Sequence, residues 1–127
     1  MKMACEKILI VDDAGFSRVC SAILETEGFN VTTISVTGNP PHKPDLEEFA
    51  LVITSYLHEL SFLDEIQALA LPVIVLVDHL SRELLVLLEN VEKSFCMIKP
   101  LDYKKLVILV QQLMNGELTS RGGYNIV

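Results

Sequence analysis

Two adjacent carboxylates, Asp12 and Asp13, are the residues of this sequence best suited to chemistry, because they directly follow four apolar residues, ILIV. A short run of this kind is typical of a strand buried on both faces of a parallel sheet. Open α/β sheets bind ligands outside the carboxyl ends of their strands. Two interpretations follow: a cation site, since a cation relieves the repulsion between neighbouring carboxylates, or a helix cap beside a solvated carboxylate.

The elements that must position this pair alternate along the chain. Further strands are predicted over residues 30–36, 51–55, 73–77 and 95–98, which are short and rich in β-branched or apolar residues. Helices are predicted between Asp13 and Gly28 and over residues 61–69, 80–88 and 103–114. Three prolines in residues 40–44 restrict any helix in the second connection to a short one near residues 44–49. Five alternations of strand and helix favour a doubly wound parallel sheet with helices on both faces.

Length and composition narrow the class of protein. A chain of 127 residues, half of them hydrophobic, fits one domain over residues 1–115, followed by a flexible polar tail over residues 116–127. No apolar run approaches the roughly 20 residues that cross a membrane, and no signal peptide is apparent, so we expect a cytoplasmic protein. Three widely spaced cysteines (Cys5, Cys20, Cys96) indicate reduced thiols rather than disulfides. The net charge of −7 disfavours nucleic acid and anionic membranes as partners.

With the acidic pair after the first strand and Lys99-Pro100 after the fifth, the chain resembles the receiver domain of bacterial two-component response regulators, the CheY-like family. The resemblance covers residues 6–115. It includes ILIVDD, a helix ending in EGF, and PVIVLV followed by FCMIKPLD. It implies a flavodoxin-like fold, in which a sheet of five parallel strands lies between two helix layers and the second helix is shortened or irregular.

The resemblance also implies roles for single residues. Asp12 and Asp13 would help to hold Mg²⁺, and Lys99 would contact a phosphoryl group, because a hard cation and a lysine neutralise phosphoryl charge. Phe95, four residues before Lys99, would be the aromatic residue that changes rotamer on activation.

Departures from the family pattern fall at the phosphotransfer positions. Ser55 stands where the acceptor aspartate is expected, and serine forms no acyl phosphate and is a poor nucleophile without a base. Val77 replaces the Thr or Ser that hydrogen-bonds the phosphoryl group, and it has no donor. Asp78 adds a carboxylate where the family carries a small residue. The segment from Ser55 to Val77 is also shorter than is usual in the family.

These departures predict a stand-alone bacterial signalling module that is not an enzyme and that works independently of phosphorylation. Its expected partner is a histidine kinase, another signalling protein or a second copy of the chain. The resemblance implies a docking surface within residues 80–114, the face on which the family binds partners. The leucines of residues 80–88 also exceed what one sheet contact buries, and an exposed apolar patch marks an interaction site. Its candidate residues are Leu84, Leu85, Leu88 and Tyr103. The same leucines would also fit a core.

Two alternatives remain open at this point. A phosphate could be accepted as an ester on Ser55, or by a shifted carboxylate such as Asp64. Mg²⁺ could instead bind weakly to Asp12 and Asp13 without phosphotransfer. The expected resting state has no cofactor and an ion pair between Lys99 and Asp13. His58 and His79 follow the third and fourth strands, where they are either solvated or part of a pH-sensitive or transition-metal site.

Overall fold

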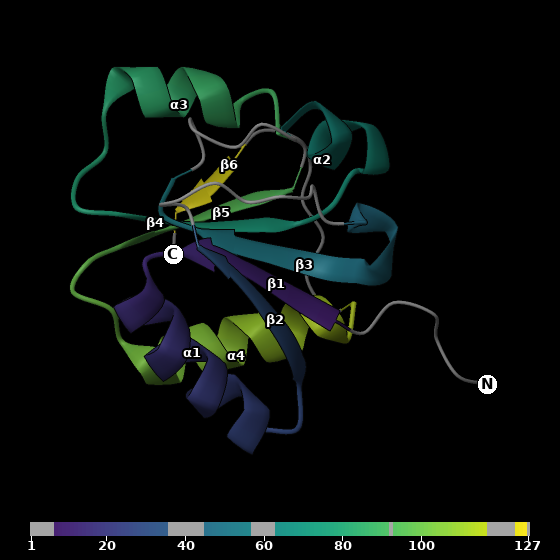
Figure 1. Cartoon of the computed structure of the whole chain (residues 1–127). Helices are drawn as coiled ribbons and strands as arrows, with labels where there is room; N and C mark the ends of the chain where they lie inside the picture. The colour runs from purple at the N-terminus through teal and green to yellow at the C-terminus, as the bar shows by residue number, and fades with distance from the viewer. Residues whose placement is uncertain (1–6, 36–44, 57–62, 92, 117–123, 127) are drawn as a thin grey trace.

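The computed structural model describes residues 7–35, 45–56, 63–91, 93–116 and 124–126, and arranges them as one parallel sheet between two layers of helices (Figure 1). The strands are β1 (Lys7–Asp12), β2 (Asn30–Ser35), β3 (Phe49–Thr54), β4 (Val73–Val77), β5 (Ser94–Ile98) and β6 (Tyr124–Ile126). Their order across the sheet is β2-β1-β3-β4-β5-β6. The predicted doubly wound fold with its five strands is confirmed, and β6 is an additional strand.

Two helices cover each face of the sheet (Figure 1). The helices α1 (Ala14–Thr26) and α4 (Tyr103–Met114) lie on one face, and α2 (Leu63–Leu69) and α3 (Arg82–Leu88) lie on the other. A single turn of 3₁₀ helix, η1 (Leu46–Glu48), precedes β3, so the helix expected near residues 44–49 is indeed short. None of the helices within the described ranges is both long enough and apolar enough to cross a membrane.

Alternation along the strands divides the hydrophobic core into two layers. Ile8 and Ile10 of β1 are fully buried against the layer of α1 and α4, whereas Leu9 points to the layer of α2 and α3. Successive strand residues point to opposite faces, so a strand covered on both sides must be apolar throughout. This is the physical reason that ILIV and VIVLV identify strands of the sheet interior.

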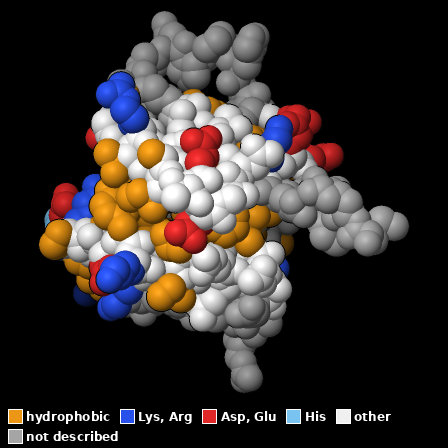
Figure 2. Space-filling model, turned by 90° about the horizontal axis from the view of Figure 1, so that it is seen from below, with side chains coloured by type: hydrophobic (Ala, Val, Ile, Leu, Met, Phe, Trp, Pro, Cys, Tyr) orange, Lys and Arg blue, Asp and Glu red, His pale blue; other side chains and the backbone are white. Residues whose placement is uncertain are grey.

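Helix α1 buries a mixed set of side chains against the sheet. Cys20 and Leu24 are fully buried, whereas the side chain of Val19 is 47% exposed and a serine, Ser17, takes an inward position at 5% exposure. Gly28 ends the helix region with a φ of 94°, which glycine adopts without strain, as predicted. Figure 2 views the face covered by α1 and α4, where hydrophobic side chains lie among acidic and basic ones.

The C-terminal segment differs most from the prediction. Residues 116–127 were expected to form a flexible tail, but Tyr124–Ile126 form β6 and pair in parallel with β5, with Ser94 opposite Tyr124 and Cys96 opposite Ile126. The strand is only three residues long and follows two glycines, so no periodicity in the sequence could reveal it.

Candidate functional site

Asp12 ends β1 as a buried carboxylate with three hydrogen bonds. Its side chain is 1% exposed. The backbone N–H of Asp13 donates to Oδ1 at 2.8 Å, and the backbone N–H and the hydroxyl of Ser55 donate to Oδ2 at 2.9 and 2.7 Å. Three donors offset the cost of burying this carboxylate away from water, so the protein itself satisfies Asp12.

The register of the sheet explains why Ser55 meets Asp12. The neighbouring strands β1 and β3 pair Val11 with Thr54, which places the next residue of each strand side by side at the carboxyl edge. Thr54 is fully buried, and its hydroxyl accepts a hydrogen bond from the backbone N–H of Tyr56 at 2.9 Å. This bond fixes the chain as it leaves β3 and directs Ser55 toward the acidic pair.

Asp13 has a different environment from Asp12. Its backbone occupies the N-cap position of α1, but its side chain makes no capping hydrogen bond. Its Oδ2 instead accepts a hydrogen bond from the phenolic hydroxyl of Tyr56 at 2.7 Å. The predicted side-chain cap is therefore wrong, although the helix begins where it was expected to begin.

The expected ion pair between Lys99 and Asp13 does not form. Both residues lie in the described part of the chain, and no hydrogen bond or ion pair joins them there. The phenol of Tyr56 takes the place that we expected for the ammonium group. The backbone N–H of Lys99 donates to the carbonyl of Val77 at 2.7 Å, which ties the ends of β4 and β5 together.

A hollow of about 280 Å³ lies beside Val77 and Lys99, at the carboxyl ends of β3, β4 and β5. It brings together most of the residues singled out in the sequence, and its lining includes Ser55, Tyr56, Val77, Asp78, His79 and Lys99. Asp78 and His79 are exposed, whereas Val77 and Lys99 are half-buried. His58, the other histidine considered, lies outside the described residues. The prediction that these strand ends converge at one edge is correct.

The acidic pair does not fit a divalent-cation site. Oδ2 of Asp12 already accepts two hydrogen bonds and Oδ2 of Asp13 accepts one, so donors occupy oxygens that a cation would need. Ser55 supplies a hydroxyl in place of a third carboxylate, and Mg²⁺ demands near-ideal octahedral geometry. Within the described ranges, no three His, Cys, Asp or Glu side chains are grouped as a metal site.

Phe95, the predicted switch aromatic, lies in the other layer of the core. It is 5% exposed and packs with Ile10, Cys20 and Leu106 in the layer of α1 and α4. The next residue, Cys96, faces α2 and α3 because side chains alternate along a strand. Phe95 therefore points away from the layer that contains Val77, so nothing in its surroundings supports the switching role that the family resemblance implied.

The predicted partner surface needs correction. Leu84 is 4% exposed and Leu88 is fully buried, so both belong to the core beneath α3 and cannot contact a partner. Leu85 and Tyr103 are half-buried. Val86, which was not singled out, is the most exposed large apolar residue of α3, at 54%.

The charge of Asp12 also affects the pKa of a buried thiol, that of Cys20. Burial first, and the negative charge of Asp12 second, raise the pKa of Cys20 to about 12. Burial also raises the pKa of Cys96. Both cysteines are free, as expected, and both thiols remain protonated near neutral pH, where a protonated thiol is a poor nucleophile.

The sequence patterns did not identify two residues of this region, Tyr56 and Ser17. Tyr56 contacts Asp13, and the only available signal was an aromatic residue directly after the position of the acceptor. Ser17 is buried in α1, and its hydroxyl has no hydrogen-bond partner among the described residues. A polar residue three positions before the inward Cys20 on a helix was the available signal for Ser17.

Comparison with known proteins supports the fold. The sequence matches no protein-family model, and no curated protein is significantly similar to it. Solved structures do match. The chemotaxis protein CheY4 of Vibrio cholerae has 17% identity and a TM-score of 0.65, with 87% of this chain and 99% of that chain covered. A CheY-like response regulator from Mesorhizobium loti has 23% identity and a TM-score of 0.64 over 86% and 98% of the two chains.

A third structure agrees with these two. A response regulator receiver domain from Clostridium thermocellum has 24% identity and a TM-score of 0.65, and covers 87% of this chain and 95% of its own. At such identities the likeness establishes the fold alone. The protein therefore has the CheY-like receiver fold, and its function must be argued from its own residues.

Proposed function

We propose that this protein is a receiver-like signalling module that carries no phosphate on a carboxylate and acts in the cytoplasm, without enzymatic activity, by binding another protein. The observation that carries the proposal is the contact between Ser55 and Asp12. The position of the acceptor holds a hydroxyl 2.7 Å from a buried carboxylate, and that carboxylate already accepts three hydrogen bonds. The acidic pair thus serves to join β1 to the end of β3.

The lining of the hollow supports the same proposal. Val77 offers a phosphoryl group no donor, and Asp78 adds a carboxylate to the rim, which repels an anion. Lys99 remains as a basic group beside this carboxylate. A site that stabilises phosphoryl transfer concentrates positive charge and donors around the phosphate. Here Asp78 offsets the charge of Lys99, and the hydroxyls of Ser55 and Tyr56 already donate to the acidic pair.

The surface that we propose for the partner is the outer side of α3 with the adjoining end of β5. Its residues are Leu85, Val86 and Ile98, the last of which is 43% exposed, with Tyr103 at the start of α4. Exposed apolar side chains of this kind mark interaction sites. The partner proposed for it is a signalling protein such as a histidine kinase, or a second copy of this chain.

Phosphorylation is tested by incubating the protein with acetyl phosphate and Mg²⁺ and then measuring its intact mass. We expect no gain in mass, while a receiver domain that accepts phosphate, run in parallel, gains one phosphate. A stoichiometric gain that hydroxylamine removes would show an acyl phosphate and overturn the proposal.

The partner surface is tested by affinity capture from the native cell. We expect Val86→Glu to lose the captured partner, whereas Val19→Glu, which changes an exposed valine on the opposite face, keeps it. Retention of the partner by Val86→Glu would show that another face is used.

One observation favours a second candidate, a phosphate ester on Ser55. The Ser55 hydroxyl donates to a carboxylate, and this geometry allows Asp12 to accept the hydroxyl proton while Oγ bonds to phosphorus and acetate leaves acetyl phosphate. The mass experiment separates this candidate from the first. An ester gives a mass gain that resists hydroxylamine and disappears in Ser55→Ala, whereas absence of any gain excludes the ester.

A further inference from the structure

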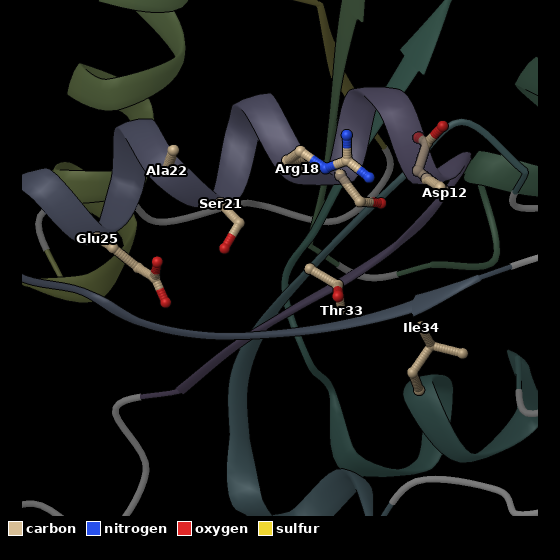
Figure 3. Close-up of a pocket in the computed structure, with 9 residues that line it drawn as sticks. Asp12, Arg18, Ser21, Ala22, Glu25, Thr33 and Ile34 are labelled. Atoms are coloured by element: carbon tan, nitrogen blue, oxygen red, sulfur yellow. The ribbon is translucent and has the colours of Figure 1, made fainter.

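A second hollow, of about 480 Å³, lies between α1 and β2, with Asp12 among the residues that line it (Figure 3). Its strand wall includes Thr33 and Ile34. Consecutive strand residues point to opposite faces, so a groove lined by both must run along the edge of the strand. The sheet order agrees, because β2 is an outermost strand. This volume is in the range of small-ligand sites in proteins.

An unsatisfied hydroxyl belongs to the helix wall of this groove. Ser17 is 5% exposed, and its Oγ is buried without a hydrogen-bond partner in the described structure. Nearly all buried polar atoms of folded proteins have a partner, so an exception that lines a cavity calls for an explanation. Ser17 is among the residues that line the groove. A polar ligand or its bound water would supply the missing partner.

Opposite charges mark the two ends of the groove along α1. Arg18 and Glu25 are both exposed, and in the described residues neither side chain has an ion-pair or hydrogen-bond partner. They are seven residues apart, which puts them on the same face of the helix but about 10 Å apart along its axis. That separation exceeds the one-turn spacing at which helix charges pair with each other. Figure 3 shows Ser21 between them, with its hydroxyl toward the strand.

We propose that this groove binds a small zwitterion of the peptide type. The carboxylate of the ligand pairs with Arg18, its ammonium group pairs with Glu25, and its amide groups meet the hydroxyls of Ser17, Ser21 and Thr33. An extended peptide advances roughly 3.3–3.6 Å per residue, so about three residues span the 10 Å between the charges. A simple anion fits less well, because Asp12 and Glu25 give this lining more acidic than basic side chains.

The probe for this proposal is triglycine, followed by chemical-shift titration of the backbone amides of the whole protein. We expect millimolar or tighter binding, with the largest shifts in α1 and β2. Glycine, which cannot reach both charges, and triglycine with acetyl and amide end groups, which lacks both charges, should bind at least about tenfold more weakly. Equal binding of the blocked peptide, or no binding of triglycine, would falsify the proposal.

Variants locate the site. Arg18→Gln and Glu25→Gln should each weaken triglycine binding about tenfold, the value expected for loss of one charged hydrogen bond. Lys104→Gln, which removes an exposed charge on α4 outside the groove, is the matched control and should leave binding unchanged. Unchanged binding in either groove variant would overturn the assignment. The inference does not depend on the proposed function, because the mass and capture experiments do not probe this groove.

Discussion

The hydroxyl of Ser55 lies 2.7 Å from Oδ2 of Asp12, and the backbone N–H of the same serine lies 2.9 Å from the same oxygen. A single residue thus gives two donors to one buried carboxylate oxygen. An aspartate at position 55 would direct a second negative charge at that oxygen, so the contact is possible only with a neutral side chain. The predictions below follow from this contact and from the burial of its neighbours.

Ser55→Asp should destabilise the protein and make it respond to Mg²⁺. The new carboxylate would face a buried like charge, at a cost on the order of 3 kcal/mol in the free energy of unfolding. Mg²⁺ relieves such repulsion, so it should raise the melting temperature of the variant and leave the unsubstituted protein unchanged. Ser55→Asn is the neutral control, which Mg²⁺ should not affect. A comparable Mg²⁺ effect on the unsubstituted protein would show that the acidic pair binds the cation as it stands.

The two acidic residues should contribute unequally to stability. Asp12→Asn places an amide group among three hydrogen-bond donors in a buried site, and we expect it to cost about 2–3 kcal/mol. Asp13→Asn alters an exposed side chain whose remaining oxygen can still accept from Tyr56, so its effect should stay within about 0.5 kcal/mol. Urea unfolding of both variants measures the difference. Equal losses would show that the acidic pair acts as one unit, as in a cation site.

Ser17→Ala should stabilise the protein. The substitution removes a buried hydroxyl that has no partner in the described part of the chain and places the best helix former inside α1, so we expect a gain of about 1–2 kcal/mol. Thermal and urea unfolding measure the gain. Ser21→Ala is the matched control, because its half-buried hydroxyl can meet solvent and only the helix propensity changes. A loss of stability in Ser17→Ala alone would mean that the hydroxyl has an internal partner in solution.

Substitutions of Leu88 and Val86 in α3 distinguish a core position from a surface position. Leu88→Ala should cost about 2–5 kcal/mol, because the side chain is fully buried and its removal leaves a cavity. Val86→Ala, at an exposed position two residues earlier, should change stability by no more than about 0.5 kcal/mol. Chemical unfolding of both proteins is the measurement. A mild effect of Leu88→Ala would restore the interpretation of this leucine as part of a partner surface.

The free energy of unfolding should decline in alkaline solution because the pKa of Cys20 is raised in the folded protein. Its pKa is about 12 in the folded protein, above the ordinary value of 9.0, so above pH 9 the unfolded chain loses this proton more readily than the folded protein does. The contribution of the protonated thiol is therefore fully present below pH 9 and is lost between pH 9 and 12, by up to about 1.4 kcal/mol per pH unit.

The control for this pH dependence is Cys20→Ala. The measurement compares the slope of the unfolding free energy against pH in this variant and in the unsubstituted protein. Burial raises the pKa of Cys96 and Tyr103 in the same direction, so the variant should keep a smaller alkaline decline. The same slope in both proteins would show that Cys20 does not titrate abnormally.

The sequence predicted the sheet well because strands buried on both faces leave an unmistakable apolar pattern. The strand VIVLV and the helix over residues 103–114 were located to the residue. The opening of α1 and its end at Gly28 were also correct, since an acidic N-cap position and a glycine with positive φ are local signals. These elements bring Asp12, Ser55 and Lys99 to one edge, as expected from parallel strands.

The details of the site could not be predicted because they depend on side-chain directions between distant segments. In place of the ion pair expected with Lys99, Asp13 accepts a hydrogen bond from the phenol of Tyr56, whose position directly after the acceptor position does not by itself give that contact. The sequence showed that α3 is rich in leucine but not which leucines face the sheet. Leu84 and Leu88 belong to the core. The groove beside β2 depends on how α1 and β2 lie against each other, which the patterns that located these two elements do not give.

The short strand β6 determines which segment of the sheet is open to other chains. Without it, the outermost strand would be β5, whose sequence SFCMI has no charge and a high β-propensity. Such strands at an open edge pair with other molecules and aggregate. We therefore expect a chain cut after residue 116 to be poorly soluble. Three residues would then decide whether the protein can be kept at high concentration.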